Sequence, residues 1–368
     1  MDIKNIIIFL LLIIIVIGGF FLYKQIKSNK KQESFTTTVL TLGFSLITMS
    51  SSDWMDKGLV AIGVITKYDD AMKLGGDFNW AYFIVGFILI IVGLFMWLYS
   101  KKRLYILNIN AYSSKKLEDY ISNLKLDNSD FREREIDFIQ IYKKIFSRNL
   151  DDESYECIKA EIEEKVTAFR NETAKVKRGY TGIAPIPFIM YAGTFLNRIK
   201  IDEYYEFDKI DTNNYYLLNK SKNAYPELKL KTNINQLYIN KNKVVIAISL
   251  TQQIEDNVLN QFVSSCNIVK IGVDNPDDNT IRYTDQLESY IDKIFDVIEQ
   301  IKVKIPNVEI SIVYSGQSCL ALEIGKRCFD DTRIPETTVY HFDIQNTDKK
   351  YPWGIIINGS NKGKLIKA

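Results

Sequence analysis

The residues from Val308 to Arg327, "VEISIVYSGQSCLALEIGKR", change character at a short polar turn. Before Tyr314 they alternate apolar and polar types like a strand, and after Gln317 they space apolar residues like one face of a helix. The turn itself consists of Ser315, Gly316, Gln317 and Ser318. Free N–H groups at a helix start can bind an anion, and glycine permits close approach of a ligand to the backbone. This turn is therefore a candidate ligand site.

A second turn of the same kind follows the apolar run in "VVIAISLTQQI". The predicted strand ends at Ser249, and Thr251 and Gln252 open a predicted helix from Gln252 to Phe262. A third turn, from Gly182 to Phe188, contains two prolines that suit a first helical turn. Ser, Thr and Gln are also ordinary helix caps, so capping alone remains an alternative reading of each turn.

The same region could instead hold a nucleophile. Cys319 follows the turn directly, and His341 is the single histidine of the chain. A catalytic thiol or hydroxyl needs such a base beside it. The turn lacks the second glycine of a G-x-S-x-G elbow, and the chain has no phosphate-binding loop of the G-x-x-x-x-G-K-[ST] type. The sequence therefore favours ligand binding without catalysis, and a hydrolase that uses Cys319 or His341 is the alternative.

Composition limits the partners. The 368 residues include 47 Lys and Arg against 45 Asp and Glu, a net charge of +2, which argues against duplex nucleic acid as a partner. The four cysteines form no C-x-x-C pair, so neither a zinc site nor any other metal or cofactor is expected. Scattered cysteines suit a reducing compartment.

Two uncharged segments predict membrane spans at residues 6–23 and 81–99. A helix of 18 residues is about 27 Å long, close to the thickness of the hydrocarbon core. Gly86 and Gly93 lie seven residues apart in the second segment, which would let another helix approach closely. The alternative is that glycines are simply common in membrane helices. The basic residues at 101–103 follow it as a cytoplasmic anchor, so the remainder of the chain is expected in the cytoplasm.

A weaker apolar segment, residues 35–52, is rich in serine and threonine and is short for a span. It is a possible third membrane segment or an interfacial one. The predicted division of the chain is thus a transmembrane effector region at 1–102, a helical connector with the first part of the sensor at 103–178, and the sensor domain at 179–368.

From Arg103 onward the chain is polar and globular, with one predicted strand followed by three charged helical stretches. After Tyr180 the pattern is mixed α/β, with strands that alternate with helices. Such alternation predicts a largely parallel sheet covered on both faces, which binds ligands at the carboxyl ends of its strands. The predicted strands are 104–109, 204–207, 215–218, 244–249, 268–273, 309–314 and 338–343. The predicted helices are 153–177, 252–262, 285–302 and 318–329.

Several segments in this order resemble a SAVED domain, the sensor module of bacterial CBASS anti-phage systems. They are "GIAPIPFIMYAG", "VVIAISLTQQI", "VEISIVYSGQSCLALEIGKR", "TTVYHFD" and "YPWGIIING". The resemblance covers roughly residues 180–359. It implies an α/β fold of two fused CARF-like, Rossmann-like units behind N-terminal transmembrane helices, as in the two-transmembrane subgroup.

The resemblance also implies a function. SAVED domains recognise a cyclic tri- or tetranucleotide made by a partner nucleotidyltransferase of the CD-NTase class. By the resemblance one wall of the site contains Ser249, Thr251 and Gln252, and the other contains Ser315 to Ser318, with Tyr314 placed to stack on a base. The expected protein is a multi-pass effector of the bacterial inner membrane that oligomerises on ligand binding, disrupts the bilayer and causes abortive infection. A third alternative is a membrane scaffold whose α/β domain binds a protein partner.

Overall fold

The structure, a computed structural model, describes residues 32–50, 79–100, 104–112, 115–120, 124, 131–145, 150–174, 176–220, 224–329 and 333–367. The chain divides into two compact units, Met1–Arg103 and Leu104–Ala368. The predicted span at 6–23 lies outside the described residues.

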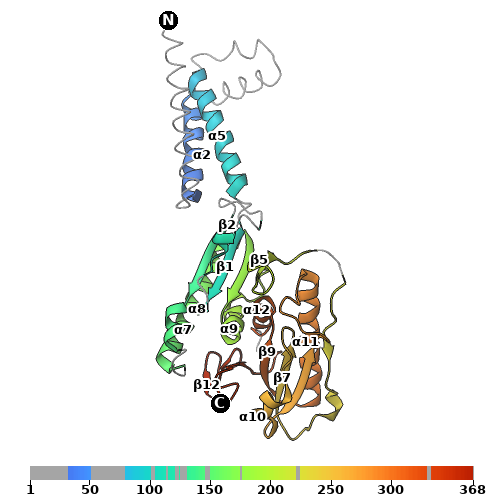
Figure 1. Cartoon of the computed structure of the whole chain (residues 1–368). Coiled ribbons are helices and arrows are strands. Elements are labelled where there is room, and N and C mark those ends of the chain that lie inside the picture. Colours follow the sequence, from blue (N-terminus) through green and yellow to red (C-terminus); the bar gives the residue numbers. More distant parts are fainter. Residues whose placement is uncertain are drawn as a thin grey trace. The chain divides into compact units, whose positions relative to one another are not determined.

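The N-terminal unit contains a pair of antiparallel helices, α2 (Gln32–Met49) and α5 (Trp80–Ser100), which lie side by side in Figure 1. They cross where Gly43 meets Gly86, since a Cβ built on Gly86 would lie 2.7 Å from the carbonyl oxygen of Gly43. A Cβ on Gly93 would lie equally close to the side chain of Leu40. The close helix approach predicted at Gly86 and Gly93 is thus confirmed.

No helix in the described part of the chain reaches the length and hydropathy required to cross a membrane. The segment predicted as a span at 81–99 is helical, within α5, and residues 35–49 of the weaker segment fall within α2. That either segment enters a membrane stays a prediction.

The C-terminal unit is α/β, as predicted, and begins with a five-stranded sheet of order β2-β1-β3-β4-β5. The first four strands run parallel, and β5 is antiparallel to β4. In chain order its elements are β1 (Leu104–Asn110), η1 (Leu117–Tyr120), β2 (Phe131–Asp137), α7 (Ile139–Ile145), α8 (Asp152–Glu172), β3 (Lys177–Ile183), α9 (Ile186–Leu196), β4 (Glu203–Asp208) and β5 (Asn214–Leu217).

A seven-stranded sheet of order β12-β11-β10-β9-β7-β8-β6 follows. Its strands β7 to β10 are parallel, and the strands beyond them on either side are antiparallel to their neighbours. The elements are β6 (Lys229–Leu230), η2 (Ile234–Gln236), β7 (Lys243–Ser249), η3 (Asp256–Leu259), α10 (Asn260–Val263), β8 (Asn267–Gly272), α11 (Thr284–Lys304), β9 (Glu309–Ser315), α12 (Ser318–Arg327), β10 (Thr337–His341), β11 (Trp353–Ile356) and β12 (Leu365–Lys367).

The two sheets repeat one design. The strand order β2-β1-β3-β4-β5 recurs as β8-β7-β9-β10-β11, with parallel and antiparallel pairs in the same places. In the middle of each half a helix, a strand and a second helix follow one another. Each of these elements starts 132 residues later in the second half than in the first: Asp152 and Thr284, Lys177 and Glu309, Ile186 and Ser318. The C-terminal unit therefore consists of two equivalent Rossmann-like halves, as the resemblance implied.

The two halves meet through α9 and α12, both of which are buried in the core that the halves share. A Cβ on Gly193 would overlap the carbonyl oxygen of Leu322, and a Cβ on Gly325 would overlap that of Met190. Met190 and Leu322, like Gly193 and Gly325, are 132 residues apart, so this contact is reciprocal, as at the interface of a twofold dimer. Each helix also packs on strands of the opposite half.

One predicted helix is wrong. Residues 252–262 do not form a continuous helix, because only Asp256–Leu259 and Asn260–Val263 are helical, as two short pieces. The chain after β7 stays close to β9 instead: the N–H groups of Leu250 and Thr251 both donate to the carbonyl of Ser315. The sequence pattern also did not predict five of the described strands, because they alternate poorly or have four residues or fewer: β2, β3, β6, β11 and β12.

Replacement of Gly325 by alanine should destabilise the C-terminal unit by about 1–3 kcal/mol, because the new methyl group must displace the backbone of α9. Urea unfolding of the full chain measures this change. Val303→Ala, at an exposed position of α11, is the control and should change the free energy of unfolding by less than about 0.5 kcal/mol. Equal stability of both variants would contradict the role of the glycine contact.

Candidate functional site

The two turns singled out in the sequence lie side by side. Strands β7 and β9 are parallel neighbours, and Ser249 is in register with Ser315 at their carboxyl ends. In a sheet of this strand order the chain leaves β7 and β9 in opposite directions, which opens a crevice beyond their carboxyl ends. Both predicted walls therefore belong to one place, the topological switch point of the second half.

Four of the predicted residues form the accessible rim of this place: Thr251, Gln252, Ser315 and Gly316. The side chain of Gln252 is exposed, and the other three residues are partly exposed. The hydroxyl oxygens of Thr251 and Ser315 lie 3.0 Å apart, and the Ser315 hydroxyl accepts a hydrogen bond from the Gln252 N–H at 3.1 Å. This network joins the two turns and presents neutral donors and acceptors to a ligand.

The other four predicted residues, Ser249, Tyr314, Gln317 and Ser318, are buried and support the rim from below. The Ser249 hydroxyl accepts from the N–H of Ile254 at 3.1 Å. The Tyr314 hydroxyl donates to the carbonyl of Gln317 at 2.7 Å, and the ring lies so close to Gly316 that any Cβ there would overlap it. Stacking of Tyr314 on a base therefore stays a prediction that requires the turn to open.

The buried amide of Gln317 ties the turn to the first half of the domain. Its nitrogen donates to the hydroxyl of Tyr216, on β5, at 2.6 Å and to the carbonyl of Ile281 at 2.9 Å. The guanidinium of Arg282 lies 4.5 Å above the ring of Tyr216. This arrangement places a cation beside the site.

The start of α12 already binds an anionic group of the protein itself. A carboxylate oxygen of Glu206, on β4, accepts the N–H of Cys319 at 2.6 Å and the hydroxyl of Ser318 at 2.9 Å. Burial raises the pKa of Glu206, and these hydrogen bonds oppose that rise. The N–H of Cys319 already donates to Glu206, so it is not available to bind a phosphate at the start of this helix.

The proposed nucleophile is unsuited to attack. The Cys319 thiol is fully buried, and burial together with the carboxylate of Glu206 raises its pKa well above the usual value. Since the thiolate is the reactive form, this thiol is inert near neutral pH. His341 stacks on Trp353 with ring centroids 4.6 Å apart, its Nε2 lies 3.3 Å from the hydroxyl of Tyr142, and burial lowers its pKa to about 4. That the chain has no catalytic activity stays a prediction.

Residues 160–357 match the family described as SAVED, the SMODS-associated and fused to various effectors sensor domain, over more than half of the chain. The chain belongs to the SAVED family. No curated protein sequence matches it.

Three solved structures of the Cap4 SAVED/CARF-domain receptor of Acinetobacter baumannii are similar to this SAVED protein. The receptor with the cyclic trinucleotide 3′3′3′-cAAA has a TM-score of 0.45 and 11% identity, covering 85% of this chain and 65% of that chain. The receptor with 2′3′3′-cAAA has a TM-score of 0.43 and 11% identity, covering 85% of this chain and 64% of that chain. The receptor alone has a TM-score of 0.41 and 12% identity, covering 80% of this chain and 62% of that chain. The chain thus spans less than two thirds of these receptors.

A second candidate place in this SAVED domain is a cavity of about 1240 Å³ between α11, α12 and the end of α9. Its lining contains six basic and six acidic side chains, and Lys326 pairs there with Glu323 and Arg327 with Asp292. Because this lining is balanced in charge, it offers a polyanion no net attraction. The paired turns remain the better candidate.

Sequence reasoning missed Glu206, although a signal existed. Residues 205–208 read Tyr-Glu-Phe-Asp, and residues 340–343 read Tyr-His-Phe-Asp. The strand pairing places Glu206 and His341 at equivalent positions of the two halves. Comparison of these two segments would have singled out both residues as a repeated position with changed chemistry.

The Glu206→Gln variant should become relatively more stable as pH rises. Glu206 has a higher pKa in the folded protein than in the unfolded chain, so its proton stabilises the fold at low pH, and this contribution is lost as pH rises through the folded pKa. The free energy of unfolding of the variant minus that of the wild type should rise by about 1.4 kcal/mol per pH unit between the two pKa values. A difference that is flat with pH would contradict the raised pKa.

Proposed function

We propose that this SAVED protein is a sensor of a cyclic oligonucleotide, which it binds at the paired turns after β7 and β9. The main support for this proposal is the hydrogen-bonded rim of Thr251, Gln252 and Ser315 at the switch point of the second half. Open α/β sheets bind ligands at such a point. The description of the family as a sensor domain supports the same reading.

The chemistry of the rim fits a cyclic tri- or tetranucleotide. Such a ligand presents base edges, ribose hydroxyls and phosphates, all of which can hydrogen-bond to amide and hydroxyl groups. Gly316 leaves room for the ring of Tyr314 beside the turn, and Arg282 supplies a nearby positive charge. We propose a partner nucleotidyltransferase of the CD-NTase class, within a CBASS anti-phage system, as the source of the ligand.

We propose further that the N-terminal unit is the effector and acts on the inner membrane. Helix α5 has no charged residue along its 21 residues, and several of its large apolar side chains are exposed. An exposed apolar surface of this kind marks a site of interaction with lipid or protein. The basic residues at 101–103 support a cytoplasmic sensor domain.

Ligand binding would act by assembling several copies. Two apolar helices with few polar groups cannot line an aqueous path alone, so a leak requires several copies. Helices in lipid gain little from hydrophobicity when they associate, and a sensor that oligomerises would supply the missing force. Disruption of the bilayer would then end the infection together with the infected cell.

The double variant Thr251→Ala, Gln252→Ala should bind the ligand about 10- to 100-fold more weakly, since each lost hydrogen bond is worth about 1 kcal/mol. Calorimetric titration of the full chain in detergent with a panel of cyclic oligonucleotides, including 3′3′3′-cAAA and 2′3′3′-cAAA, measures the affinity. Gln345→Ala, also at an exposed position, is the control and should bind like the wild type. No binding of any cyclic oligonucleotide by the wild type would contradict the sensor function.

The Gly86→Leu variant should lose ligand-induced leakage of vesicles and keep the ligand affinity of the wild type within about twofold. A leucine there cannot fit against the carbonyl of Gly43, so α2 and α5 must separate. Leakage of an entrapped dye, at increasing protein density, measures the effect, with Phe95→Leu on the exposed surface of α5 as the control. Ligand-bound wild type that leaves vesicles intact at every density would contradict the membrane function.

A further inference from the structure

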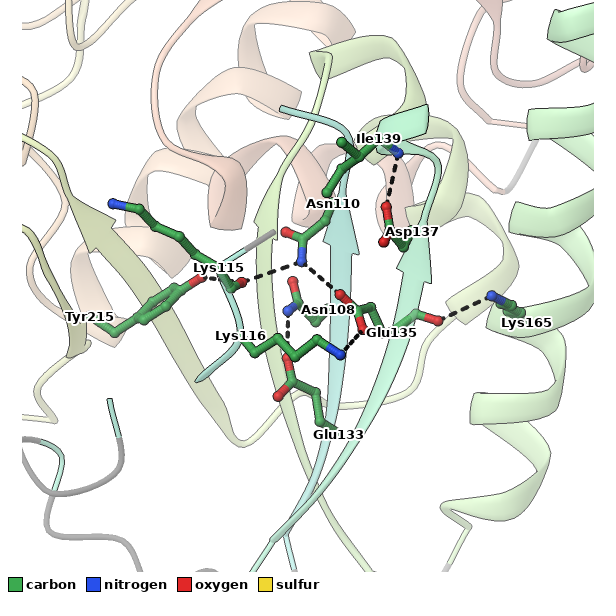
Figure 2. Close-up of polar contacts among 10 residues, drawn as sticks. All are labelled: Asn108, Asn110, Lys115, Lys116, Glu133, Glu135, Asp137, Ile139, Lys165 and Tyr215. Carbon is green, nitrogen blue, oxygen red and sulfur yellow. Dashed lines mark hydrogen bonds and ion pairs between the residues drawn. The ribbon is translucent and has the colours of Figure 1, made fainter. Parts of the chain in front are cut away.

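Buried polar side chains gather on the outer face of the first sheet, away from the paired turns. Asn108 and Asn110 point from β1 to the same face, and neither is exposed. Figure 2 shows the amide of Asn108 between the carboxylate of Glu133 and the amide of Asn110. The nitrogen of Asn108 donates to Glu133, and that of Asn110 lies 3.4 Å from both a carboxylate oxygen of Glu135 and the carbonyl oxygen of Lys115.

Two amide oxygens in this cluster have no donor. The amide oxygens of Asn108 and Asn110 are buried without any hydrogen-bond partner. A buried polar group without a partner costs about 1–3 kcal/mol, and native proteins hold few of them. Two such oxygens on alternate residues of one strand therefore indicate a ligand site more than a defect of packing.

The second half of the domain provides an internal comparison. By the pairing of β1 with β2 and β3, and of β7 with β8 and β9, Asn108 corresponds to Ala247 and Glu133 to Ile268. Ala247 lies in an apolar cluster with Val245 and Val313, against which Ile268 packs. By the same pairing Asn110 corresponds to Ser249 and Glu135 to Lys270, so these two positions are polar in both halves. At the positions of Asn108 and Glu133 the second half is apolar, so polarity there is not a requirement of the architecture.

A flip of the Asn110 amide would gather several oxygens in this cluster. The two contacts of the Asn110 nitrogen are long, at 3.4 Å, so a half-turn of this amide loses little hydrogen-bond energy. The Asn110 oxygen would then lie beside the Glu135 carboxylate and the Lys115 carbonyl, with the amide of Asn108 adjacent. Carboxylate, amide and backbone carbonyl oxygens are the mixture that Ca²⁺ takes as ligands.

We propose that this cluster is a binding site for a hard divalent cation, of which Ca²⁺ fits best, with ligands from Asn108, Asn110, Glu135 and the carbonyl of Lys115. Glu133 adds a second carboxylate and attracts the cation. Lys116, whose ammonium lies 3.0 Å from Glu135, is half-exposed and can swing into solvent when the cation enters. In the part of the chain that the structure describes, no group of three or more His, Cys, Asp or Glu side chains could hold a metal ion. The proposed site instead combines carboxylates with amide and backbone carbonyl oxygens.

The cation should raise the melting temperature of the full chain, because it binds the folded protein and satisfies its orphaned oxygens. After treatment with EDTA, the wild type should melt at a higher temperature as Ca²⁺ is added, more so than with Mg²⁺. Asn110→Ser, which copies Ser249 of the second half, and Asn108→Ala, which copies Ala247, should remove this shift. Asp274→Asn, at an exposed ion pair far along the other sheet, is the control and should keep it.

Terbium provides a second measurement on the full chain. Tb³⁺ occupies Ca²⁺ sites and emits when a nearby tyrosine is excited, and the Tyr215 hydroxyl lies 3.3 Å from the Lys115 carbonyl. The wild type should show this emission, Ca²⁺ should suppress it, and Asn110→Ser should weaken Tb³⁺ binding at least tenfold. A wild type that melts at one temperature in EDTA and in millimolar Ca²⁺, or equal Tb³⁺ emission from wild type and Asn110→Ser, would overturn the proposal.

Discussion

The close contact between α9 and α12 is the constraint on which the sensor domain depends. Gly193 and Gly325 let each helix rest against the backbone of the other, and each helix also packs on strands of the opposite half. Any side chain at either position would push the halves apart, because both contacts are to backbone atoms that cannot rotate away. The halves therefore share one core. A movement of the turn before α12 would shift side chains that pack against the first half.

Glu206 gives this coupling a chemical form. It extends from β4 of the first half to the start of α12 in the second, where it accepts the N–H of Cys319 and the hydroxyl of Ser318. The positive end of the helix is thus neutralised from within. If the proposed ligand binds at the rim, its contacts would then be to the hydroxyl and amide groups there and to Arg282, and the N–H of Cys319 would not take part. The equivalent position of the other half holds His341, and there α9 begins with prolines that remove N–H donors.

Two equivalent halves have thus acquired different chemistry on one scaffold. At the positions of Asn108 and Glu133 the first half is polar, whereas the second half has the apolar Ala247 and Ile268 (Figure 2). At the carboxyl end of the strand, Asn110 of the first half stands where the second half has Ser249. Because the shared strand order and the glycine contact fix the architecture, the outer positions are free to differ. The pattern is that of a duplicated unit in which each copy keeps the fold and carries its own sites.

The sequence by itself determined the α/β class, most of the strands of the second half, the two turns and the close helix approach at Gly86 and Gly93, because local periodicity and glycine spacing encode them. It also supplied the family resemblance, since the motifs follow one another in a fixed order. It could not determine that Thr251 begins a loop rather than a helix, because the hydrogen bonds of that loop go to Ser315, 64 residues away. Nor could it reveal that Tyr314 is buried, that Glu206 occupies the start of α12, or that two asparagine oxygens lack donors. Those facts depend on which strands become neighbours, and only the tertiary structure brings residues so distant along the chain within hydrogen-bond range.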